Sequence, residues 1–250
     1  MPAGVVDTGS GQPVVFLHGL VGLNDHWEAV AAGVQHRCRC IMLELPLLEL
    51  TGDDCSIHGA TELTARFLRT YLKGEPAVLV GNSFGGHVAA RLSFEHQDLV
   101  RGLVLAGASG LIEKSMVSDV QIKPSREWLE RKIGELFFDR SRMNHADVDR
   151  AFGELSQRDK ARAMVRLSRT ARRNHVGDDL GKIAAPTLIV WGRQDIVTPP
   201  EACEQFHRKI RGSRVVWIEN CGHAPMIEAD GVFAAALNQF LDEIGHVPRS

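Results

Sequence analysis

The 250-residue sequence lacks several features that would assign it to a specialised class of protein. No apolar run approaches the roughly 20 residues of a membrane-spanning helix, and no basic stretch followed by an apolar segment opens the chain, as it would in a secretory signal. The net charge of −2 provides little attraction for nucleic acid or an anionic membrane. We therefore expect a cytoplasmic protein that binds a small-molecule substrate and neither nucleic acid nor a membrane; the oligomeric state stays open.

Cysteines are few, odd in number and scattered: Cys38, Cys40, Cys55, Cys203 and Cys221. This distribution fits reduced thiols better than a framework of disulfides. Cys38 and Cys40 are two residues apart, but no second pair or nearby histidine completes the set of about four ligands that structural zinc needs. We predict neither a metal nor a cofactor.

Six short apolar runs, each ending near Gly, Asn or Pro, indicate strands at residues 14–17, 40–43, 77–80, 103–106, 187–191 and 214–218. Nearly continuous apolar runs are typical of strands buried on both faces of a parallel sheet. Helical spacing of apolar residues at 61–72 and 232–244 separates some of these runs. The alternation predicts an α/β fold, a mostly parallel sheet with helices on both faces.

Residues 111–180 break this rhythm, because they contain amphipathic helical patterns and no convincing strand. The segment holds 15 of the 29 Lys and Arg residues but 12 of the 31 Asp and Glu residues, so it is slightly basic. We interpret it as a helical cap inserted over the carboxyl ends of the strands, where ligands bind in such sheets. Residues 1–110 and 181–250 form the predicted core.

Ser83 lies in the stretch Gly-Asn-Ser-Phe-Gly-Gly, between a predicted strand and a predicted helix. Such a tight turn strains its central residue and raises the serine hydroxyl above the sheet, while the flanking glycines allow close packing. The alternative from this motif alone is a serine that caps the helix. A nucleophilic serine requires a base, so the presence of a suitable histidine elsewhere in the chain distinguishes the two interpretations.

Two residues in loops after later strands can complete that chemistry. His223 follows the strand at 214–218 in an irregular loop between Gly222 and Pro225, and Asp195 follows the strand at 187–191. The alternative for Asp195 is a carboxylate that caps a turn. The order Ser, Asp, His is the order found in serine hydrolases built on parallel sheets, which favours an enzyme.

An oxyanion formed at Ser83 needs two backbone N–H donors. Phe84 follows the serine and is one candidate. Leu20 is the other, because Gly19 lets the loop after the strand at 14–17 turn toward Ser83. We expect His18 to support this loop by a hydrogen bond and not to act as a second base.

Four stretches carry a resemblance to a known family: PVVFLHGL, VLVGNSFGGHVAARL, APTLIVWGRQDIVTPP and IENCGHAPMIEAD. With them the chain resembles the α/β-hydrolase fold superfamily over nearly its whole length. The resemblance implies a Ser83–Asp195–His223 triad and a lid at 111–180. GNSFGG is similar to the corresponding turn of carbon–carbon bond hydrolases and of some carboxylesterases.

The sequence departs from the family in three places. Relatives usually have a Gly-rich Asp-x-Pro-Gly-x-Gly turn where this chain has Glu44-Leu45-Pro46-Leu47-Leu48-Glu49, so the shape of a loop that often flanks the pocket is open. Carbon–carbon hydrolases often have Trp where this chain has Ala224. Few residues precede Val14, and we therefore expect the early antiparallel strands of the fold to be mostly absent.

The predicted function is a serine hydrolase that cleaves small or medium carboxylic esters through an acyl-enzyme on Ser83. The alternatives are a carbon–carbon bond hydrolase of vinylogous diketones (dienoates) and a non-catalytic protein that uses the fold to bind a ligand. A dienoate needs a cation for its carboxylate, and the candidates are arginines spaced along one helical stripe: Arg158, Arg162, Arg166, Arg169 and Arg173. We expect this stripe to face water, because Met164 and Ser168 lie on the opposite, more apolar side.

Overall fold

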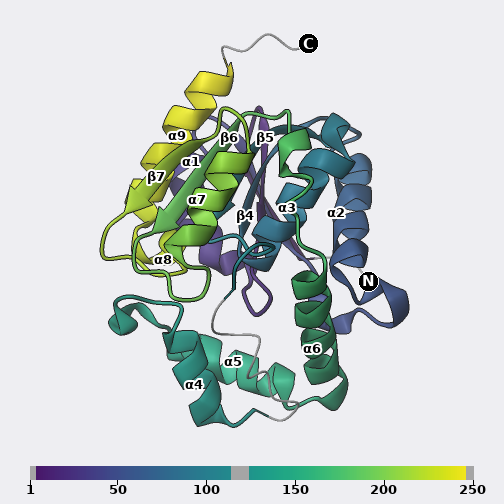
Figure 1. The fold of residues 1–250 in the computed structure, drawn as a ribbon, viewed down its shortest axis with the longest axis vertical. Helices are drawn as coiled ribbons and strands as arrows, with labels where there is room; N and C mark the ends of the chain where they lie inside the picture. Colours follow the sequence, from purple (N-terminus) through teal and green to yellow (C-terminus); the bar gives the residue numbers. More distant parts are fainter. Residues whose placement is uncertain (1–3, 114–123, 246–250) are drawn as a thin grey trace.

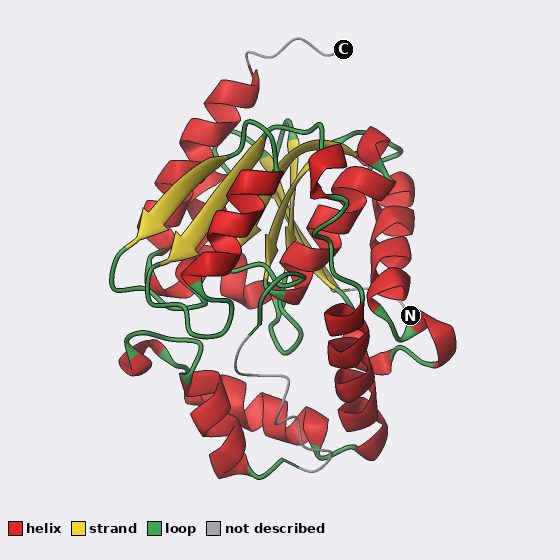
Figure 2. Cartoon of the chain, in the orientation of Figure 1, coloured by secondary structure: helices red, strands yellow, loops and turns green. Residues whose placement is uncertain are grey.

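The computed structural model describes residues 4–113 and 124–245. A seven-stranded sheet in the order β1-β3-β2-β4-β5-β6-β7 forms the centre, with helices on both faces (Figures 1 and 2). The strands are β1 (Gly4–Gly9), β2 (Pro13–Leu17), β3 (Arg39–Glu44), β4 (Ala77–Asn82), β5 (Val100–Ala106), β6 (Thr187–Gly192) and β7 (Arg214–Ile218). The α-helices are α1 (Glu28–Val34), α2 (Ile57–Tyr71), α3 (Phe84–Glu95), α4 (Arg126–Gly134), α5 (His145–Leu155), α6 (Arg158–Arg173), α7 (Pro200–Lys209), α8 (Pro225–Glu228) and α9 (Asp230–Gly245). The predicted α/β fold is confirmed.

Strands β2 to β7 are parallel, and β1 pairs antiparallel with β3. The expectation that early antiparallel strands are mostly absent is therefore corrected for one strand, β1. From β2 the chain crosses to β3 on one side, and later returns to β4 on the other side. Such a reversal opens a crevice at the carboxyl ends of the central strands. Loops after β2 and β4 therefore meet at one place.

Alternate residues of β2 belong to two separate apolar cores, one on each face of the sheet. Val15 and Leu17 pack into the core that includes side chains of α2, α3 and α7, such as Leu68 and Val88. Val14 and Phe16 pack into the other core, with residues of α1 and α9. Since both faces are covered, the central strands are fully buried, and their carboxyl-end loops are held in place.

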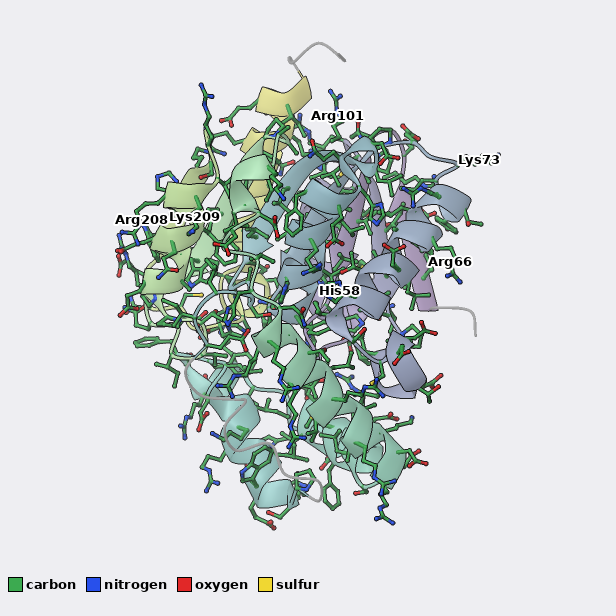
Figure 3. All side chains as sticks on the ribbon, turned by 45° about the vertical axis from the view of Figure 1, so that its right-hand side comes forward. His58, Arg66, Lys73, Arg101, Arg208 and Lys209 are labelled. Atoms are coloured by element: carbon green, nitrogen blue, oxygen red, sulfur yellow. The ribbon has the colours of Figure 1, made fainter. Side chains whose placement is uncertain are left out.

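Helices α4, α5 and α6 are inserted between β5 and β6, and they lie below the carboxyl ends of the strands in Figure 1. No strand occurs in the described part of the predicted insertion; residues 114–123 lie outside the described residues. The proposed boundaries at 110 and 180 stay predictions. Two contacts fasten α6 to α2: the Ile57 N–H donates to Thr170 Oγ1 at 3.1 Å, and His58 Nε2 lies 3.1 Å from Asn174 Oδ1 (His58 is labelled in Figure 3).

All five cysteines are free thiols with buried side chains. They lie in different parts of the molecule: Cys38 and Cys40 near α1, Cys55 before α2, Cys203 in α7 and Cys221 after β7. Within residues 4–113 and 124–245, no helix has both the length and the apolar character that a bilayer span requires.

Candidate active site

Ser83 sits at the point where β4 ends and α3 begins, with the unusual backbone angles φ 53° and ψ −118°. A positive φ is strained for a residue with a Cβ atom and is typical of functional turns. Neighbouring glycines make the turn possible: a Cβ on Gly81 would lie 2.4 Å from the Gly85 carbonyl oxygen, and one on Gly85 would lie 2.4 Å from that of Leu17. The Ser83 side chain accepts no capping hydrogen bond from α3, which argues against the capping alternative. Its hydroxyl is therefore free of a structural role in the helix.

Asp195 is 2 % exposed and uses its two carboxylate oxygens differently. Oδ1 accepts hydrogen bonds from the backbone N–H groups of Val197 and Thr198 at 2.8 and 2.9 Å. Oδ2 lies 2.8 Å from His223 Nδ1 and 2.9 Å from Thr198 Oγ1. A buried carboxylate is stable only with such partners, and here they fix its orientation toward the imidazole.

His223 is also buried, in the loop that follows β7. Because Nδ1 faces Asp195, Nε2 is the ring nitrogen left for the cavity. Two further bonds hold the backbone of this residue: its N–H donates to the Leu136 carbonyl at 2.7 Å, and its own carbonyl accepts from Asn82 Nδ2 at 3.0 Å. Gly107, with φ 50°, lies against the pair, and a Cβ there would stand 2.9 Å from His223 Nδ1.

The loop after β2 brings Leu20 to the same place. A Cβ on Gly19 would lie 3.4 Å from Ser83 Cβ, so the loop passes directly beside the serine. Phe84 is the first residue of α3, and the first N–H groups of a helix have no partner within the helix. The N–H of Leu20 and that of Phe84 are therefore both candidate donors to an oxygen held near Ser83.

His18 supports this loop, as predicted. Its Nε2 accepts the Leu45 N–H at 3.0 Å, so the proton is on Nδ1, which donates to the Gly19 carbonyl at 2.7 Å. Burial lowers the pKa of His18 to about 4, which keeps the ring neutral. The ring ties the loop after β2 to the loop after β3 and has no nitrogen left to act as a base.

Ser83, Thr198 and His223 line one cavity of about 130 Å³ between the sheet and the inserted helices. Its wall is mostly apolar, and α4 to α6 contribute Trp128, Leu129, Ile133, Ala151, Leu155, Met164 and Ala171 to it. Polar side chains also reach it: His26 Nε2 lies 3.1 Å from Asp147 Oδ2, and both line the cavity. The cavity can hold an apolar molecule with a polar group beside Ser83.

The loop at 44–49, whose shape the sequence leaves open, lines a cavity beside that of Ser83. Together with α5 and α6 it lines a second cavity of about 260 Å³, which shares Leu20, Val21, Gly22, Ala151 and Leu155 with the first. Leu47–Glu49 form a short 3₁₀ turn there. None of residues 44–49 lines the cavity of Ser83.

The arginine stripe of α6 is exposed, as expected, while Met164 and Ser168 are buried and line the cavity. Another cation, Lys132 of α4, was not predicted from the sequence: it is 7 % exposed, lines the cavity and pairs with Glu135 at 3.1 Å. Asn82 and Thr198, which hold His223 and Asp195, were not predicted either. Their only signal was their place next to the candidate residues.

One cluster among the described residues has the composition of a metal site, Glu62, Glu95 and His96. Glu95 and His96 lie at the end of α3 opposite Ser83, about 18 Å away at the helical rise of 1.5 Å per residue. Exposed carboxylates at such a distance have no part in chemistry at the serine.

The family model described as "Alpha/beta hydrolase family" matches residues 14–236. The chain belongs to the alpha/beta hydrolase family. Similar curated members include a 2-hydroxy-6-oxo-6-(2'-aminophenyl)hexa-2,4-dienoic acid hydrolase of Metapseudomonas resinovorans, 26 % identical over 98 % of this chain and 89 % of that protein. A pimeloyl-[acyl-carrier protein] methyl ester esterase of Neisseria meningitidis serogroup B is 29 % identical over 67 % of this chain and 69 % of its own length. The relatives are hydrolases, so this alpha/beta hydrolase is an enzyme of that broad type.

Solved structures of hydrolases have the same fold as this chain. An alpha/beta hydrolase enzyme from the metagenome of lagoon sediments of Mar Chica, Morocco, superposes with a TM-score of 0.77 at 28 % identity, covering 96 % of this chain and 94 % of that one. A serine hydrolase involved in carbazole degradation gives 0.82 at 25 % identity, with 96 % and 95 % coverage. The similarity extends over the sheet and the inserted helices alike.

Proposed function

We propose that this alpha/beta hydrolase is a serine esterase that cleaves small or medium carboxylic esters. The observation that carries the proposal is the convergence on one apolar cavity of a strained, partly exposed Ser83 and a buried Asp195–His223 pair. A serine becomes nucleophilic when a positioned base can take its proton. Three loops supply these groups from the ends of β4, β6 and β7, which is the arrangement typical of serine hydrolases on parallel sheets.

In the proposed reaction, Ser83 Oγ attacks the ester carbonyl carbon while His223 Nε2 takes the hydroxyl proton. Asp195 Oδ2 accepts the Nδ1–H bond and stabilises the imidazolium. The N–H groups of Leu20 and Phe84 hold the oxyanion. The carbon–oxygen bond to the alcohol then breaks, and the alcohol leaves with the proton from His223. Water attacks the acyl-enzyme with the same base, and this step releases the acid and restores Ser83.

We further propose that α4, α5 and α6 act as the cap and bind the acyl chain. Apolar side chains of these helices line part of the cavity, so methylene groups of a bound chain that lie against them can be removed from water. Ala224 is buried beside His223 and leaves room for a leaving alcohol. No cofactor takes part in the proposed reaction. The free thiols favour a reducing compartment, and we place the protein in the cytoplasm on that basis.

Cleavage of a carbon–carbon bond in a dienoate is the second candidate, and Lys132 is the observation that favours it. A buried cation in the cavity wall can meet a substrate carboxylate, although Lys132 already pairs with Glu135. The dienoic acid hydrolase of M. resinovorans is a relative over most of this chain. The exposed arginine stripe of α6 and the alanine at 224 favour the ester instead.

The test compares p-nitrophenyl esters of increasing acyl length with a 2-hydroxy-6-oxo-dienoate, in wild type and in Ser83→Ala. We expect kcat/KM to be higher for the esters and to fall to background in the folded variant. A preference for the dienoate of more than about 100-fold, roughly 2.7 kcal/mol of transition-state discrimination, would show that the ester assignment is wrong. Labelling of Ser83 by a fluorophosphonate without multiple turnover of any substrate would point to a ligand-binding protein.

A further inference from the structure

Glu228, the last residue of α8, accepts three backbone hydrogen bonds from two segments far apart in the sequence. Its Oε1 accepts the N–H groups of Phe138 and Asp139 at 2.9 and 3.0 Å. Its Oε2 accepts the N–H of Gly222 at 2.7 Å. Hydrogen bonds to an ionised carboxylate are roughly twice as strong as neutral ones. One half-buried side chain therefore clamps two backbone segments together.

The two segments belong to different parts of the proposed machinery. Gly222 directly precedes His223, whereas Phe138 and Asp139 follow α4, whose side chains Trp128 and Ile133 line the cavity. Figure 1 shows α8 immediately above the teal segment that leads out of α4. The His223 N–H also bonds to the carbonyl of Leu136, so the base loop and residues 136–139 are in contact at two places.

The base loop packs closely against residues 136–138 at Gly222. A Cβ on Gly222 would lie 2.7 Å from the Leu136 carbonyl oxygen and 2.8 Å from the Phe138 nitrogen. A movement of residues 136–139 is therefore transmitted to the backbone of the base loop. The imidazole of His223 moves with that backbone. A displacement of a catalytic group by about 1 Å can lower a rate about 100-fold.

We propose that Glu228 is a positioning residue that fixes the proposed base, His223, relative to the inserted helices that bind the substrate. The inference rests on the proposed function of Ser83 and His223. Glu228 does not touch the reacting atoms; it sets the distance between the base loop and the cavity wall through the hydrogen bonds that it accepts from backbone N–H groups.

Glu228→Gln separates this role from a general contribution to folding. An amide has one acceptor oxygen and one donor NH₂ group. In either orientation the NH₂ faces N–H donors, so the bond to Gly222 or the pair to Phe138 and Asp139 is lost. Glu219→Gln is the matched control, because Glu219 lies in the same loop region, is exposed and pairs only with Arg193 among the described contacts. Glu228→Asp keeps two acceptor oxygens on a shorter side chain and serves as a second variant.

The experiment measures kcat per active site, with sites titrated by complete labelling with a fluorophosphonate, and KM for a p-nitrophenyl ester. We expect kcat per site to fall about 10- to 100-fold in Glu228→Gln, less in Glu228→Asp, with KM changed less than threefold and Glu219→Gln unchanged. A residue with only a structural role would lower the number of titrated sites or the Tm and leave kcat per site unaltered.

An unchanged kcat per site in Glu228→Gln overturns the proposal. If that variant does not fold, Glu228→Asp decides in the same way, because full turnover per site with a shortened carboxylate is equally incompatible with a positioning role. A wild-type protein that is neither labelled at Ser83 nor active on any ester would overturn the proposed function itself, which is a distinct result.

Discussion

Asp195 has two tasks that one substitution can separate. In Asp195→Asn, the amide oxygen can still accept the N–H groups of Val197 and Thr198, while the NH₂ group faces His223 Nδ1. The imidazole is then held in the wrong tautomer, and we expect kcat to fall about 10⁴-fold. Because the loop keeps its caps, Tm should fall by only a few degrees. Kinetics and thermal unfolding on the same sample check both parts; loss of folding without a specific loss of kcat would make Asp195 purely structural.

Position 107 requires glycine for two reasons: its φ is positive, and the side chains of His223 and Asp195 leave no space for a Cβ atom. In Gly107→Ala, the new methyl group would meet His223 Nδ1 at 2.9 Å and Asp195 Oδ2 at 3.2 Å. We expect this variant to lose at least tenfold in kcat/KM. Gly212→Ala is the control, since Gly212 also has positive φ, at 74°, but has open space around it. It should lose about 1–2 kcal/mol of stability through backbone strain and retain wild-type kcat. Equal activity in the two variants would contradict the packing argument.

The strands in the middle of the sheet could be predicted from the sequence because they are buried on both faces, which requires continuous apolar runs. β1 could not: it is an edge strand with only Val5 and Val6 as apolar residues, and most of its residues are exposed. β7 was predicted at its observed bounds although its side chains are only partly buried.

Those residues of the candidate site that lie in local turns after strands could be predicted from the sequence. Ser83, Asp195 and His223 each follow a strand in a loop marked by Gly or Pro, so their positions could be read from the sequence. Asn82, Thr198 and Glu228 act through contacts between segments far apart in the chain, such as the bond from Asn82 to the His223 carbonyl. No periodicity or turn signal encodes such a contact, and only the folded chain reveals it.

Helix α5 should determine which acyl lengths are accepted. Ala151 lines the cavity, and in Ala151→Phe a ring would fill part of its volume of about 130 Å³. We expect kcat/KM for an octanoate ester to fall more than tenfold and that for an acetate ester to change less than threefold. Gly153→Phe, on the same helix but in open space, is the control and should leave the profile unaltered. A uniform loss across all chain lengths would instead indicate overpacking of the fold.

The stability of the whole molecule should decrease as the pH falls below about 6.5. Burial lowers the pKa of His18 to about 4 and that of His87 to about 3, whereas both rings titrate near 6.5 in the unfolded chain. Between these values the unfolded state binds more protons, so the contribution of the two neutral rings to the free energy of unfolding is fully present above pH 6.5 and is lost progressively toward pH 3. Asp7 and Asp147 add to this loss at the acid end: Arg39 lowers the pKa of Asp7, and for Asp147 the opposing effect of burial is outweighed by His26 and Arg150, which lower its pKa.

Urea unfolding between pH 7 and pH 4.5 measures this dependence. His87→Leu removes one of the two rings whose pKa is lowered by burial and should flatten the dependence of the urea midpoint on pH, while His145→Gln, at an exposed position on α5, should not. A wild-type midpoint that does not change over this range would contradict the neutral state of the buried rings.

The five buried thiols can serve as probes of local opening, because a reagent can modify each one only when the segment that covers it opens. Burial raises the pKa of Cys203 and Cys221 to about 12, so a thiol reagent meets almost no thiolate at these positions until the covering segment opens. Cys55 lies under α6, against the carbonyl of Ala163, and Cys221 belongs to the loop of His223. We expect Cys55 and Cys221 to be modified before Cys40, which lies in the core beneath α1. A ligand that fills the cavity should slow modification of the first two selectively, so the order of labelling measured by mass spectrometry would show which parts open separately and which open only when the whole chain unfolds.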